Sequence, residues 1–185
     1  MWDWRAAGAP LRETEATGHC QRLQWSPDNR LVVACNDGLL RAYRMQAGAL
    51  VRLAKAPSPG GAEPYGLAFS PDGRLLAVSQ DKSPRVDVLD GQTLALQYTA
   101  DSQGLKDGNF NAVAWSADGR TLAAGGGLAV RNINIVRRWS DAGRGAPTDT
   151  PTAGNSIFGL LTLPHGGWLL TASGSACGIS ELLPS

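Results

Sequence analysis

Residues 65–79 read YGLAFSPDGRLLAVS, and most of this stretch recurs at residues 112–123 as AVAWSADGRTLA. A third version, LQWSPDNRLVVA, spans residues 23–34, and a more divergent fourth, GLLTLPHGGWLLTAS, spans residues 159–173. Each copy consists of two apolar runs separated by a short turn. An apolar anchor residue ends the first run of each copy, and we place it at Trp25, Phe69, Trp115 and Leu163.

The spacing of these anchors decides the architecture. Consecutive anchors are 44, 46 and 48 residues apart. A repeat of about 40–50 residues is the length of a propeller blade made of four short strands. The sequence therefore predicts an all-β propeller of four-stranded antiparallel blades, with about four blade equivalents. A helical fold is disfavoured, because glycine and proline total 34 of the 185 residues and no segment holds a 3.6-residue period.

The turn inside each copy predicts a hairpin. Asp72-Gly73 and Asp118-Gly119 lie between apolar runs, and this dipeptide is a strong hairpin signal because both of its positions need positive φ. Asp28-Asn29 and Gly166-Gly167 fill the same slot with residues that tolerate positive φ. The second runs are apolar on both faces, which is typical of strands buried between stacked blades.

The repeat divides a single domain, residues 1–185, into five parts. Residues 1–19 end one blade with its outermost strand, and residues 155–185 supply an incomplete blade of three strands. Three whole blades are predicted at 20–63, 64–109 and 110–154. The termini allow a closed four-blade ring in which 10–17 pairs near 179–182, because pairing of this kind removes exposed edges. We favour the other possibility, a fragment of a larger ring or assembly with further blades from another chain.

Several dipeptides lie at the ends or starts of the repeats. Trp2-Asp3 precedes Gly18-His19, Tyr43-Arg44 and Trp139-Ser140 end later copies, and Val88 or Leu89 holds that place in the second copy. With the Ser-Pro-Asp-Gly turn, these motifs resemble the WD-repeat propellers over nearly all of the chain. In that family a His, a Ser or Thr, the Trp and a turn Asp form a hydrogen-bonded network inside each blade. The resemblance implies structural roles at Trp2, Asp3, His19, Trp25, Asp37, Phe69, Asp72, Asp81, Trp115, Asp118 and Trp139.

Composition excludes several classes of protein. A net charge of +1, from 17 basic and 16 acidic residues, provides no global field for nucleic acid or an anionic membrane. No apolar run approaches the roughly 20 residues of a membrane span. Cys20, Cys35 and Cys177 are odd in number and widely spaced, which predicts reduced structural thiols in a cytoplasmic protein. Fourteen of the basic residues are arginine, as is typical of GC-rich bacterial genomes.

The sequence offers little catalytic chemistry. His19 and Cys20 are neighbours and would point to opposite faces of a strand, so we expect a blade-interior histidine and a core thiol. His165 belongs to a turn and is expected to be solvated. Two histidines without clustered carboxylates predict no metal site, no cofactor and no catalytic residue. Gly125–Gly127 is expected to be a loop between strands, with no helix after it to cradle a phosphate.

Two features are left as candidates for binding. Residues 125–144 are longer than the matching part of the other copies. We expect a charged, solvated hairpin there, and the alternative is an exposed basic ribbon that contacts an acidic partner. The candidate partner-binding residues are Arg131, Asn134, Arg137 and Arg138. The connectors at 56–64, 101–109 and 145–156 are predicted to emerge on one face, either as binding loops or as spacers.

The favoured function is a non-enzymatic scaffold for protein–protein interaction, with a protein partner of unknown identity. The family resemblance implies that it could be the sensor or interaction part of a larger bacterial signalling or effector protein. One alternative is a lactonase-like or hydrolase propeller enzyme, which would need carboxylates or histidines converging on the central channel. Another is a truncated fragment without independent activity.

Overall fold

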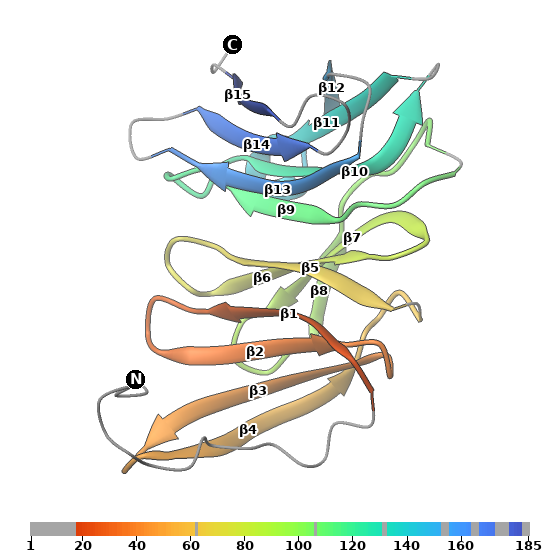
Figure 1. The fold of residues 1–185 in the computed structure, drawn as a ribbon. Helices are drawn as coiled ribbons and strands as arrows, with labels where there is room; N and C mark the ends of the chain where they lie inside the picture. The colour runs from red at the N-terminus through yellow and green to blue at the C-terminus, as the bar shows by residue number, and fades with distance from the viewer. Residues whose placement is uncertain are drawn as a thin grey trace.

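The computed structural model describes residues 18–61, 63–105, 107–130, 133–152, 156–163, 167–172 and 178–182. These residues form four antiparallel sheets, which we call blades 1 to 4 (Figure 1). The prediction of an all-β protein with four-stranded antiparallel blades is confirmed. No helix among the described residues is long and apolar enough to cross a membrane.

Each blade follows chain order from its inner to its outer strand. Blade 1 contains β1 (Cys20–Trp25), β2 (Arg30–Cys35), β3 (Leu39–Gln46) and β4 (Ala49–Pro57). Blade 2 contains β5 (Pro64–Phe69), β6 (Leu75–Gln80), β7 (Ser83–Asp90) and β8 (Leu96–Thr99). Blade 3 contains β9 (Ala112–Trp115), β10 (Leu122–Val130), β11 (Ile133–Trp139) and β12 (Pro147–Pro151), with a short 3-10 turn, η1 (Asp141–Gly143). Blade 4 contains β13 (Ile157–Thr162), β14 (Trp168–Ala172) and β15 (Gly178–Leu182).

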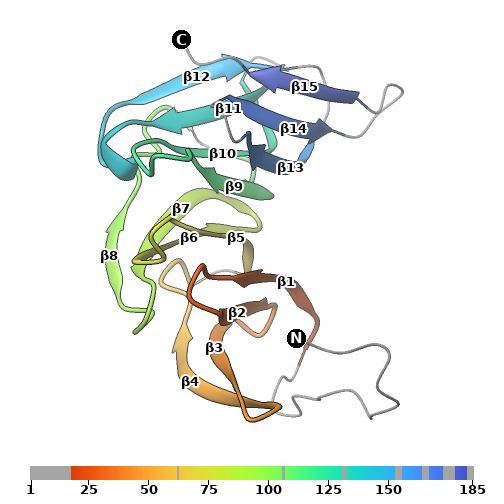
Figure 2. The same cartoon turned by 90° about the vertical axis from the view of Figure 1, so that its left-hand side faces the viewer.

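The four inner strands β1, β5, β9 and β13 hold the blades together. Contacts join β1 to β5, β5 to β9 and β9 to β13, and the blades follow one another in an arc (Figures 1 and 2). Between blades 1 and 4 the described structure has a long hydrogen bond of 3.5 Å, from Arg22 Nη2 to the Phe158 carbonyl. Pro10–Thr17, the predicted ring-closing strand, lies outside the described residues, so that closure stays a prediction.

Each blade has a front face, which meets the preceding blade, and a back face, which meets the following one. The back faces carry small residues and the front faces carry larger ones, so that neighbouring blades interdigitate. Val32 and Ala34 pack against Leu67 and Leu76, Ala77 and Val88 against Val113 and Leu122, and Ala112 and Ala123 against Ile157 and Leu160. Burial on both sides explains why the second runs lack strict alternation.

The turns differ in one respect from the sequence expectation, because only their second residue takes a positive φ. These residues are Asn29, Gly73 and Gly119, at 62°, 71° and 71°. Their N–H groups donate to the carbonyls of Ser26, Ser70 and Ser116, so that each loop is a closed turn followed by one left-handed residue. The aspartate keeps an ordinary backbone and accepts a hydrogen bond from the serine hydroxyl, at 2.6–2.7 Å.

These serine hydroxyls make the turns sensitive to acid. The Ser70 and Ser116 hydroxyl donors hold the pKa of Asp72 and Asp118 below the usual value of 3.8. A carboxylate whose pKa is lower in the folded state stabilises the fold above its unfolded pKa and loses that contribution as pH falls through the folded pKa. We therefore expect the free energy of unfolding to fall below about pH 4, and to fall less steeply in a Ser70→Ala, Ser116→Ala variant. Urea unfolding measured at a series of pH values around pH 4 checks this prediction. If the free energy of unfolding depends on pH in the same way in both proteins, the serine hydroxyls are not the cause.

The fourth anchor is shifted by one residue from its predicted place. Backbone hydrogen bonds run from Ser116 N to Thr121 O in blade 3 and from Leu163 N to Gly167 O in blade 4. Leu163 therefore occupies the serine position, and Thr162 is the equivalent of Trp115. The turn of blade 4 is as short as that of blade 1 and one residue shorter than those of blades 2 and 3, so alignment of its second apolar run with blade 2 misplaced the anchor.

The closing positions follow from strand register. Tyr43, Leu89 and Trp139 pair with Leu31, Leu76 and Leu122 at the same place in blades 1 to 3, so Leu89 rather than Val88 holds it in the second copy. Trp139 is buried, and its indole N–H donates to the Asp101 carbonyl at 2.7 Å. The tryptophan implied by the family network thus bonds to a connector backbone.

Gly125–Gly127 is wrong as a loop, since these residues lie inside β10. A Cβ atom at Gly125 would come within 2.8 Å of the Ile157 side chain of blade 4, and one at Gly126 would collide with the Asn109 carbonyl. The glycines therefore serve close approach of neighbouring backbone and side chains.

His19 and the cysteines also depart from expectation. His19 is exposed, so it is not a blade-interior histidine. Cys20 and Cys35 form a disulfide, with Cα atoms 3.9 Å apart, so the prediction of reduced thiols is wrong for this pair. The two residues are register partners on β1 and β2, which their separation of 15 residues does not reveal. His165 and Cys177 lie outside the described residues.

Candidate functional site

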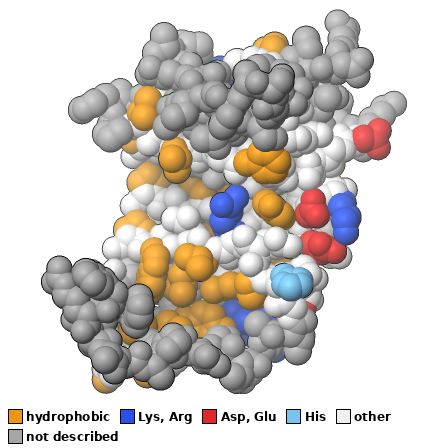
Figure 3. All heavy atoms as spheres, in the orientation of Figure 1, with side chains coloured by type: hydrophobic (Ala, Val, Ile, Leu, Met, Phe, Trp, Pro, Cys, Tyr) orange, Lys and Arg blue, Asp and Glu red, His pale blue; other side chains and the backbone are white. Residues whose placement is uncertain are grey.

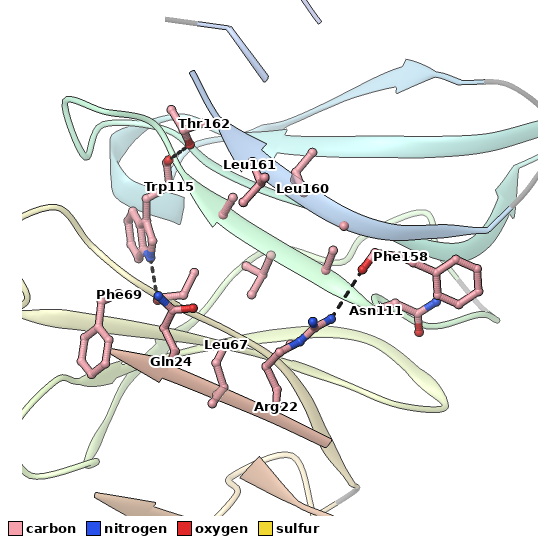
Figure 4. Close-up of a pocket in the computed structure, with 16 residues that line it drawn as sticks. Arg22, Gln24, Leu67, Phe69, Asn111, Trp115, Phe158, Leu160, Leu161 and Thr162 are labelled. Carbon is pink, nitrogen blue, oxygen red and sulfur yellow. Dashed lines mark hydrogen bonds between the residues drawn. The ribbon is translucent and has the colours of Figure 1, made fainter. Parts of the chain in front are cut away.

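A groove of about 370 Å³ lies along the inner strands of all four blades (Figure 4). Its lining comes from Arg22 and Gln24 of β1, residues 66–69 of β5, residues 111–115 at β9 and residues 158–162 of β13. The repeat explains this convergence, because each copy places its first apolar run on the innermost strand. The groove is therefore a product of blade stacking rather than of any single repeat.

Arg22 supplies the positive charge of the groove. Its side chain points across the groove toward β13 (Figure 4), where Nη2 donates to the Phe158 carbonyl at 3.5 Å. The guanidinium carbon lies 5.9 Å from the centroid of the Tyr65 ring, at the outer limit of a cation–π contact. Arg22 is exposed, and it has no carboxylate partner within the part of the chain that the structure describes.

Amide groups add hydrogen-bonding capacity beside this arginine. The Gln24 amide nitrogen donates to the Trp25 carbonyl at 3.2 Å. Asn111 is buried, and its side-chain oxygen accepts from Asn109 at 3.0 Å. Asn109 also donates to Asp81 at 3.0 Å and accepts from Gly127 N–H, which ties the groove to blades 2 and 3.

Apolar side chains form the remaining wall. Trp115 is buried between blades, and its indole N–H donates to the Ala68 carbonyl at 3.0 Å. The Thr162 hydroxyl donates to the Trp115 carbonyl. Phe158 and Leu161 are exposed on β13, and Phe158 lies beside Arg22. The inner strands are thus tied to one another across blades, which gives the groove a firm frame.

The lining determines what the groove can do. Its described residues include one cation, two amides, the Thr162 hydroxyl and apolar groups, without a carboxylate, histidine or cysteine. Among the described residues there is also no cluster of three His, Cys, Asp or Glu side chains that could hold a metal ion. The arrangement suits recognition by hydrogen bonds, charge and apolar contact.

The predicted basic ribbon is placed differently from expectation. Arg137 is 4% exposed, and its guanidinium binds Asp149 through Nε at 2.7 Å and Nη2 at 2.8 Å. Its third nitrogen donates to the Gln103 carbonyl at 2.9 Å. Asn134 is also buried. The expected exposure of these two residues is wrong, because β11 is a central strand between β10 and β12.

Arg138 is half-buried and donates to the Thr150 hydroxyl at 3.3 Å. Arg131 lies outside the described residues. Partner binding by Arg131, Asn134, Arg137 and Arg138 stays a prediction, and for Arg137 the ion pair with Asp149 occupies the groups that a partner would need.

The structural positions implied by the family resemblance lie mostly in turns and inter-blade contacts. Asp37 accepts from Leu39 N–H and pairs with Arg41 at 2.6 Å. Phe69 lies 5.5 Å from the guanidinium of Arg30, which reaches across from blade 1. Trp2 and Asp3 lie outside the described residues.

The groove residues were missed at the level of sequence. Arg22, Phe158 and Leu161 precede the turns by a few residues on the inner strands, where the four copies differ most. Aligning the copies by their turns would have marked these positions as variable members of an otherwise repeated strand. That signal, rather than the long insertion, leads to the groove.

Comparison with known proteins supports the repeat assignment. The family described as WD domain, G-beta repeat, matches residues 10–44 and 59–86. These matches cover the first two inner strands of the groove. No curated protein matches the chain.

Proposed function

The chain carries WD40 repeats folded as propeller blades, and on this premise we propose that it is a non-enzymatic scaffold for protein–protein interaction. The groove along β1, β5, β9 and β13 is the proposed binding surface. The observation that carries this proposal is that Arg22, which lacks a described carboxylate partner, stands beside exposed Phe158 in the groove. Rigid frames that present unsatisfied polar and apolar groups are typical of binding surfaces.

The same lining favours an acidic partner segment. An arginine recognises carboxylates through parallel N–H donors, and such bonds are about twice as strong as those between neutral groups. The described lining carries no negative charge that would compete for Arg22. Phe158 offers contact area for an apolar side chain next to the acid. We therefore expect a short extended segment that combines Asp or Glu with apolar residues.

A central-channel enzyme would need an acid, base or nucleophile that the described lining of the groove does not supply. The role of the scaffold within a larger bacterial signalling or effector protein stays part of the proposal. The buried setting of Arg137 favours the groove over the basic ribbon as the place of recognition.

Selection from a random peptide library tests the proposal. Peptides that bind the protein are expected to be enriched in acidic and apolar residues. Because a hydrogen bond to a charged group contributes about 1.5–3 kcal/mol, Arg22→Glu should weaken their binding by at least about tenfold. Arg74→Glu is the matched control, since Arg74 lies on the exposed turn of blade 2 and pairs loosely with Asp72 at 3.7 Å. An equal loss of peptide affinity in both variants, or enrichment of basic peptides in the selection, would contradict the proposal.

A further inference from the structure

The front face of blade 1 differs in exposure from the equivalent faces of the other blades. Leu23 is 59% exposed, whereas its register equivalents Leu67 and Val113 are 5% and 6% exposed. Trp25 is 43% exposed, whereas Trp115 is 4% exposed. Figure 3 shows hydrophobic side chains at the surface over β1 and β2. The residue types are the same, so the difference lies in the absence of a covering blade among the described residues.

The second strand of blade 1 extends this contrast. Leu31 and Val33 pair with Trp25 and Leu23, so they lie on the same front face, and both are only half-buried. Their equivalents Leu76, Val78 and Leu122 are fully buried against the preceding blade. Four apolar residues on two neighbouring strands are thus left partly open to solvent.

The back face of blade 4 shows the complementary feature. Leu161 is the register equivalent of Ala68 and Ala114, which pack against the next blade. Leu161 is 62% exposed. The described contacts therefore cover every front and back face except the front of blade 1 and the back of blade 4.

We propose that the front face of blade 1 docks against the back face of blade 4 of a second copy of this chain. Each of the three internal interfaces joins a front face to a back face, and the two open faces have the same two kinds of surface. Closure within one copy would cover Leu23 and Trp25, and their exposure argues against it. Propellers typically contain four to eight blades, so two copies with four blades each close a ring within that range, and three copies exceed it.

The internal interfaces also supply a polar contact for this junction. Trp115 donates its indole N–H to the carbonyl of Ala68 on the preceding blade, at 3.0 Å. Trp25 has the same register as Trp115, and Leu161 has the same register as Ala68. In the assembly, the Trp25 indole therefore donates to the Leu161 carbonyl of the second copy. An interface of a front face with a back face is heterologous. The assembly stops at two copies only if the rotation that relates one copy to the next closes the ring.

Sedimentation of the full chain over the micromolar range tests the proposal with two variants, Leu23→Glu and Leu161→Glu. The unchanged protein is expected at the mass of two copies, and each variant at the mass of one. An equimolar mixture of the variants should recover a two-copy species, because the intact front face of one meets the intact back face of the other. Leu96→Glu is the control, since Leu96 is exposed on β8 and lies on neither open face.

A single-copy mass for the unchanged protein would overturn the proposal and assign the front face to closure within the chain or to another protein. A mixture that stays single-copy would overturn the front-to-back pairing. Circular dichroism monitors the fold of each variant. Loss of fold in Leu23→Glu would also overturn the proposal, because it would mean that Leu23 is buried within one copy.

Discussion

Arg137→Ala is expected to lower the free energy of unfolding by about 1.5–3 kcal/mol, because it removes the charge-assisted hydrogen bonds of a buried guanidinium, whereas Asp149 keeps access to solvent. Arg137 is buried and forms two parallel hydrogen bonds with Asp149, and a third to the Gln103 carbonyl. These contacts join β11, β12 and the connector that follows blade 2. The loss should therefore loosen blade 3 and its contact with blade 2 together. Urea unfolding gives the measurement.

Arg120→Ala is the matched control, because Arg120 is exposed and lies 4.0 Å from Asp118. Exposed substitutions usually change stability by less than about 0.5 kcal/mol. Arg137→Met should recover part of the loss, because its side chain fills the buried space that alanine leaves empty. A loss below about 1 kcal/mol in Arg137→Ala would mean that the guanidinium is solvated, as expected for an exposed ribbon.

Reduction of the Cys20–Cys35 disulfide is expected to lower the free energy of unfolding by about 3 kcal/mol, the value for a closed loop of about 15 residues in the chain-entropy model. The bond links β1 to β2 at the end of their register, opposite the turn. Its loss should fray the inner strand that carries Arg22. Urea unfolding with and without a reductant measures the effect.

Cys20→Ser should match the reduced protein and show no further response to the reductant, whereas Cys177→Ser should respond as the unchanged protein does. Two labelled thiols at Cys20 and Cys35 in the untreated protein would contradict the disulfide. Disulfides persist mainly in oxidising compartments, so that outcome would favour the predicted cytoplasmic location.

Much of the fold could be predicted from the sequence because each copy repeats the same pattern of apolar strands and turn residues. The turn residues Gly73 and Gly119 take the expected positive φ, and the serine and aspartate before them close the loop. The even spacing of Trp25, Phe69 and Trp115 places them at one register in three blades. In blade 4 the turn is one residue shorter than in blades 2 and 3 and lacks the serine, and this broke the alignment; blade 1 has an equally short turn but keeps Ser26 and Asp28.

The site was less accessible, because it depends on contacts between copies. The basic composition of residues 125–144 suggested that Arg137 is exposed. Arg137 is buried because β12 pairs with β11 and brings Asp149 opposite it, and the sequence does not specify that pairing. The Cys20–Cys35 bond depends on the register of β1 and β2. Arg22 is an ordinary strand residue until stacking brings β13 to face it.

Hydrogen exchange of the protein bound to a selected acidic peptide tests the central claim, that recognition takes place in the groove. Amides of the inner strands, at 66–69, 111–115 and 158–162, are expected to exchange more slowly in the complex, and Arg22→Glu should remove that protection. The connectors at 56–61, 101–105 and 145–152 should be unchanged. Protection confined to those connectors, with the inner strands unaffected, would contradict the groove and place recognition on the loops between blades.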